Sequence, residues 1–195
     1  MKHTRAVAAI AAASAVLLAL AAPASAAPPE IDHWTEHSEH IEQVEHAADD
    51  WCPDIPFDVL YVDDSYGTFR GMVRGGKFIG ATTIHSESAW INVETGKQFS
   101  RVWQGQEKDL KVVDNGDGTI TLTGLFTGPT KYYDDDGNQV FKDVGRTFNT
   151  VILDEAGTPA YPDDDVFVEF ISSEAKGSFD TMDRDFCADL MHFIG

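Results

Sequence analysis

The chain has 195 residues, of which 43% are hydrophobic and 24% are charged, and 33 acidic against 14 basic residues give a formal net charge of −19. This length suffices for one domain with a sizeable core, and the composition excludes a collagen, a disordered chain and a membrane protein. The negative charge also disfavours nucleic acid and anionic lipid as partners.

The first 26 residues have the pattern of a secretory signal peptide. Lys2 and Arg5 precede an apolar run over residues 6–22, and Ala24, Ser25 and Ala26 supply the small residues of a cleavage site. No stop-transfer segment follows. The sequence therefore predicts a secreted, extracellular protein without a membrane span.

Residues 27–50 form a distinct acidic segment. Between Glu30 and Asp50 the chain has eight acidic residues, four histidines and no Lys or Arg. The apolar residues keep a helical spacing, which predicts a helical extension that packs by one face on the rest of the protein. These residues are Ile31, Trp34, Ile41, Val44 and Ala48.

Three histidines of this segment, His33, His37 and His40, stand at positions i, i+4 and i+7 and would share one side of the helix. Three imidazoles at this spacing could hold zinc or copper. The metalloprotease pattern HExxH is absent, so a solvated acidic helix without a metal is favoured and no cofactor is expected. The acidic runs at 114–117, 134–136 and 163–165 suggest calcium binding, but residues 134–138 match only part of an EF-hand loop, and ordinary tight turns use the same residues.

Residues 51–195 have the pattern of strands joined by short turns. Strand-like runs alternate with glycine-containing turns, and residues 182–194 have the spacing of a short closing helix. Eight to ten sequential strands predict a mainly β domain, a single antiparallel meander closed or nearly closed as a barrel. A β-sandwich is the alternative.

The longest pair of runs, 119–133 and 139–153, allows its register to be predicted. A turn centred between Asp136 and Gly137 places Gly128 opposite Gly145. Two glycines at the same level of a hairpin remove side chains from both strands, which is expected where a sheet bends sharply.

Cys52 and Cys187 are the only two cysteines. An even number in an exported chain predicts a disulfide, which would connect the beginning of the strand-rich domain to its C-terminal helix.

Short motifs along residues 51–191 together resemble a group of small exported proteins from high-GC Gram-positive bacteria with barrels of the calycin or allene-oxide-cyclase type. The motifs are Trp-Cys-Pro at 51–53, Phe-Asp-Val at 57–59, Asn-Val-Glu-Thr-Gly-Lys at 92–97, Asp-Gly-Thr-Ile-Thr at 117–121 and Phe-Cys-Ala-Asp-Leu at 186–190. The resemblance implies an exported barrel. It implies no established function and no catalytic residue.

The sequence has no nucleophile elbow, P-loop or dinucleotide-binding glycine pattern. It therefore favours a non-catalytic binding protein whose ligand is a small apolar molecule in the barrel mouth or a partner protein on the outer sheet. Candidate ligand-binding residues are Trp90, Trp103, Phe126 and Phe148.

The alternative is an extracellular enzyme in which His85, in a stretch rich in Ser and Thr, acts as general base with a carboxylate that the sequence does not identify. An apolar cavity without convergent polar groups would favour binding. A buried pair of a histidine and a carboxylate would favour catalysis.

Overall fold

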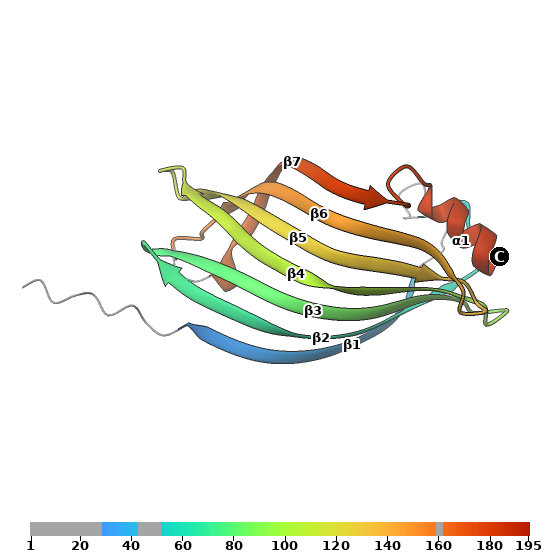
Figure 1. Ribbon diagram of the computed structural model, residues 1–195. Coiled ribbons are helices and arrows are strands. Elements are labelled where there is room, and N and C mark those ends of the chain that lie inside the picture. The colour runs from blue at the N-terminus through green and yellow to red at the C-terminus, as the bar shows by residue number, and fades with distance from the viewer. Residues whose placement is uncertain (1–28, 43–51, 159–161) are drawn as a thin grey trace, which may run out of the picture.

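The computed structural model describes residues 29–42, 52–158 and 162–195. It contains one antiparallel sheet in which every strand pairs with the next along the chain (Figure 1). The strands are β1 (Glu30–Glu42), β2 (Val59–Arg74), β3 (Lys77–Asn92), β4 (Gln98–Asp114), β5 (Thr119–Tyr133), β6 (Gln139–Asp154) and β7 (Val166–Phe179). A 3-10 turn, η1 (Pro162–Asp164), precedes β7, and helix α1 (Phe186–Ile194) follows it. The predicted meander and closing helix are confirmed, but the described residues form seven strands rather than eight to ten. The predicted signal peptide lies outside the described residues.

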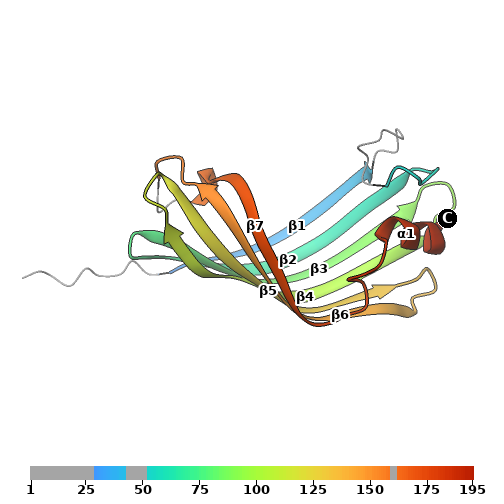
Figure 2. The same ribbon diagram turned by 90° about the horizontal axis from the view of Figure 1, so that it is seen from above.

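The sheet is open within the described residues. Its order runs from β1 to β7 with no pairing between these two, so each is an edge strand. The strands are strongly bent and the sheet forms a trough, but it is neither closed as a barrel nor folded into a two-sheet sandwich (Figure 2).

The predicted helix in the acidic segment is wrong for residues 30–42, which form strand β1. Each residue of β1 has a partner in β2, from Glu30 opposite Gly71 to Glu42 opposite Val59. Trp34, Ser38 and Glu42 are its half-buried residues. A spacing of four residues returns to the same side of a strand as well as of a helix, and pairing with β2 decided between the two. Residues 43–50 of the predicted helix lie outside the described residues.

The predicted hairpin register is confirmed. Gly128 lies opposite Gly145, which in turn lies opposite Gly177 of β7. A Cβ atom at Gly128 would overlap the carbonyl oxygen of Gln104 in β4. The strands therefore approach more closely at this level than side chains allow, and Figure 2 shows β6 and β7 bending near their midpoints.

An aromatic core fills the end of the trough next to α1. Phe99 is 1% exposed and its ring stacks on that of Phe193 of α1, with centroids 4.8 Å apart. Asp185 caps the N-terminus of α1 by accepting hydrogen bonds from the backbone N–H groups of Cys187 and Ala188. The Cys52–Cys187 disulfide is formed, as predicted, and connects α1 to the segment before β2.

Candidate functional site

Side chains alternate between the face of the sheet that α1 covers, called the α1 face here, and the opposite face. Trp90, Trp103 and Phe126 are on the α1 face, whereas Phe148 is on the opposite face. Trp90 is 8% exposed and belongs to the core, where its ring packs edge-on against Phe186. Of the four predicted ligand-binding residues, only Trp103 and Phe126 line the same cavity.

Two adjoining cavities lie on the α1 face between the aromatic core and the bend in the sheet. One, of about 360 Å³, is lined by Phe126, Tyr132 and Asp143 among others. The other, of about 370 Å³, reaches toward β1. Arg101 and Trp103 line both, so these two residues of β4 stand at the centre of the trough.

Arg101 is held from two sides. Its guanidinium lies over the Trp90 ring, 5.5 Å from the centroid, and its Nη2 donates a hydrogen bond to Ser88 Oγ at 2.9 Å. Its Nε is buried and has no hydrogen-bond partner within the described residues. A buried donor of this kind costs free energy unless a further acceptor reaches it.

Asp63 on β2 balances the charge of Arg101. Its Oδ2 accepts hydrogen bonds from the hydroxyls of Ser86 at 2.8 Å and Ser88 at 2.6 Å. Burial raises the pKa of Asp63, but the bonds from Ser88, Ser86 and Ser65 and the charge of Arg101 outweigh it, so the pKa is lowered from its ordinary value. The site therefore holds a carboxylate and a guanidinium at neutral pH.

The sequence reasoning missed Arg101, Asp63 and the serines around them. A signal was present, because Ser86 and Ser88 occupy the same face of β3 as the buried Trp90. Polar residues at inward positions of a strand mark a buried polar site, but without the strand pairing nothing connected them to Arg101.

The three histidines of the predicted metal site are not brought together. As a strand, β1 places His33 and His37 on one face and His40 on the other. His37 Nδ1 lies 2.8 Å from Asp64 Oδ1, and this hydrogen bond is the main reason that the pKa of His37 is raised. The described part of the chain contains no group of three His, Cys, Asp or Glu side chains placed to hold a metal ion.

The acidic run at 134–136 forms an ordinary turn. The Asp134 carboxylate accepts hydrogen bonds from the backbone N–H and the side-chain amide of Asn138.

His85 is on the opposite face, where its Nε2 lies 2.9 Å from Glu87 Oε1. The Glu87 side chain is 64% exposed, so this is not the buried pair that would favour catalysis.

At the far end of the trough, a third cavity of about 300 Å³ has mainly apolar walls and contains Asp109. Burial raises the pKa of Asp109, and the hydrogen bond that its Oδ2 accepts from the Gly80 N–H, at 2.7 Å, offsets this only in part. Burial, followed by the charge of Asp109, also raises the pKa of Glu107.

We expect Asp109→Asn to increase the free energy of unfolding at pH 8. A carboxyl whose folded pKa is raised contributes stability that is fully present below its unfolded pKa, about 3.9, and is lost as the pH rises through the folded value. The amide stays neutral and its oxygen still accepts from Gly80, so the advantage of the variant should vanish toward pH 3.5. Urea unfolding at several pH values measures this, with the exposed Asp136→Asn as control. An equal gain in the free energy of unfolding at pH 8 and at pH 3.5 would show that the ionised Asp109 carboxylate is not its cause.

No helix within the described ranges is long and apolar enough to cross a lipid bilayer. Comparisons of the chain with protein-family models, with curated proteins and with solved structures found no match.

Proposed function

We propose that the protein is a secreted, non-catalytic binding protein and that its trough holds a small, mainly apolar molecule with one hydrogen-bond acceptor. The observation that carries the proposal is the buried Arg101 Nε, which faces no acceptor within the described residues and belongs to a side chain lining both central cavities. A ligand acceptor that displaced the atoms covering this nitrogen would satisfy the donor.

Both cavities have aromatic side chains among polar ones, and these aromatic walls support a ligand with an apolar body. Trp103 and Phe126 line one cavity, and Trp34 and Tyr61 line the other together with Trp103. Volumes of about 360 and 370 Å³ fall in the range of small-molecule sites, which are mostly apolar with a few placed polar groups.

The charges around Arg101 refine the ligand class that the sequence predicts. Asp63 already balances the guanidinium, so the ligand need not carry a full negative charge. The expected ligand is therefore amphipathic rather than purely apolar, with an acceptor such as a carbonyl or hydroxyl oxygen. In this proposal the curved, open sheet serves as the wall of the binding site.

Native mass spectrometry of protein purified from culture medium tests the proposal. We expect a retained small molecule on the wild-type chain and its loss from Arg101→Gln, because the amide cannot reproduce the guanidinium donors. Arg70→Gln, an exposed arginine on the opposite face, should retain the adduct. A wild-type chain without an adduct, or equal adducts on both variants, would contradict this function.

A further inference from the structure

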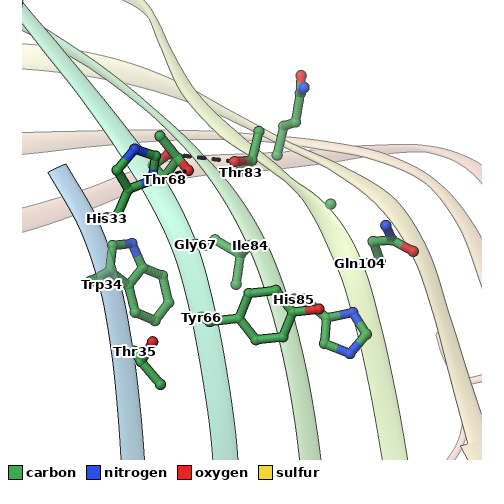
Figure 3. A pocket seen from close by; sticks show the side chains of 12 residues that line it. His33, Trp34, Thr35, Tyr66, Gly67, Thr68, Thr83, Ile84, His85 and Gln104 are labelled. Carbon is green, nitrogen blue, oxygen red and sulfur yellow. Dashed lines mark hydrogen bonds between the residues drawn. The ribbon is translucent and has the colours of Figure 1, made fainter. Parts of the chain in front are cut away.

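A groove with a volume of about 720 Å³ lies on the opposite face of the sheet (Figure 3). It crosses β1 to β4 and is formed by three consecutive residues of each strand. Its floor is the backbone of Trp34, Gly67, Ile84 and Gly105, which lie side by side in register. The side-chain positions of these four residues point to the α1 face, so only backbone borders the groove here.

Two rows of side chains border the floor. One row across the four strands is Thr35, Tyr66, His85 and Gln104. The other row is His33, Thr68, Thr83 and Gln106. All eight side chains carry a hydrogen-bonding group, and none is Asp, Glu, Lys or Arg, although 24% of the chain is charged.

Charged residues begin only in the next row on each side. Beyond Tyr66 and His85 the same face carries Asp64 and Glu87. Beyond Thr68 and Gln106 it carries Arg70 and Lys108. The groove is therefore a polar stripe without Asp, Glu, Lys or Arg between an acidic and a basic border.

Within the stripe, several groups are free to bind. No hydrogen bond joins the side chains of Tyr66, Gln104 or Gln106 to another residue of the described ranges. The rings of Tyr66, which is 55% exposed, and His85 lie side by side, with centroids 4.9 Å apart and planes inclined by 32° (Figure 3). They form an aromatic platform next to free amides.

We propose that this groove is a second binding site, separate from the trough, and that it binds a neutral oligosaccharide. A sugar ring presents hydroxyls to amide, hydroxyl and imidazole groups and an apolar C–H face to an aromatic ring, which matches the two kinds of group in the stripe. The strands repeat these groups every ~4.8 Å, so an extended chain crossing four strands meets a new set at each step. A protein partner fits less well, because protein interfaces centre on buried apolar anchors and the two rows contain no large aliphatic side chain.

Isothermal titration of the protein purified from culture medium tests this site with four defined probes. These are hexasaccharides of β-1,4-linked glucose, β-1,4-linked N-acetylglucosamine, β-1,4-linked xylose and α-1,4-linked glucose. We expect at least one to bind and its affinity to fall at least tenfold in Tyr66→Ala and in Gln104→Ala. The matched control is Tyr133→Ala, which removes a tyrosine from the same face in β5, outside the groove, and should bind as wild type does.

Salt separates a neutral ligand from an ionic one. The affinity should be the same at low salt and at 1 M salt, where the Debye length is about 3 Å. Absence of binding to all four probes, loss of binding in high salt, or an equal loss in Tyr133→Ala would overturn the proposal. If the wild-type protein self-associates and Tyr66→Ala abolishes this association, the groove binds a second copy of the chain. That result would also overturn the proposal. Arg101→Gln should leave this binding unchanged, so the result is independent of the ligand in the trough.

Discussion

Replacing both Cys52 and Cys187 by Ala should lower the free energy of unfolding by about 5 kcal/mol. The two cysteines are 135 residues apart in the sequence, and on the loop-entropy model a disulfide that closes so long a ring removes a large part of the freedom of the unfolded chain. The bond also connects α1, which supplies Leu190 and Ile194 to the core, to the segment that carries Ile55. Without it, α1 should separate from the sheet early in unfolding.

Denaturant titration of the double variant measures this effect. The reduced wild-type protein is the matched control, because it lacks the bond but retains both side chains, and it should lose a similar amount of stability. Free-thiol labelling of the unreduced, denatured wild-type chain should detect no thiol. Two reactive thiols, or an unchanged unfolding midpoint in the variant, would contradict the prediction.

The second large effect is expected for Gly128→Ala, which should cost on the order of 3 kcal/mol or more. Gly128 has φ +133°, a backbone conformation that residues with a side chain rarely adopt, and a Cβ there would overlap the carbonyl oxygen of Gln104. The added methyl therefore forces either a new backbone conformation or a separation of β5 from β4.

Gly124→Ala, four residues earlier in the same strand, is the control. A Cβ at Gly124 meets only the Phe126 ring at 3.7 Å, an ordinary contact, so this variant should be neutral or should gain about 0.4–1 kcal/mol from the reduced freedom of the unfolded chain. Thermal and urea unfolding compare the two variants. If Gly128→Ala and Gly124→Ala lose the same stability, replacing any glycine in this strand has that cost. The close approach of the strands at the bend is then not the cause.

The expected strands and turns agree with the structure where local signals are strong. The turn over residues 134–138 has side chains that complete it, and it sets the register of β5 against β6, which is why Gly128 could be placed opposite Gly145 in advance. The two cysteines could be paired because the chain has no others.

Local signals were insufficient for β1. Its polar residues and four-residue repeat fit a helix as well as a strand, and most of its side chains are exposed on either interpretation. Residues 30–42 form a strand rather than a helix because the edge of β2 offers backbone hydrogen-bonding partners, and no local sequence pattern reveals this edge. The predicted arrangement of His33, His37 and His40 depended on the helix and is wrong for the same reason, because a strand places alternate residues on opposite faces.

By itself, the sequence determined the antiparallel meander, the register of the β5–β6 hairpin and the disulfide, because turns and a single cysteine pair are properties of short segments and of composition. It predicted eight to ten short strands, whereas β2, β3 and β4 are long and continuous. Only the tertiary structure decided which side chains meet. Arg101, Asp63 and Ser88 come from three different strands, and so do Tyr66, His85 and Gln104. Each of these groups lies across three consecutive strands, so its side chains meet only when the registers of β2 against β3 and of β3 against β4 are set, and neither candidate site could be located from its residues alone.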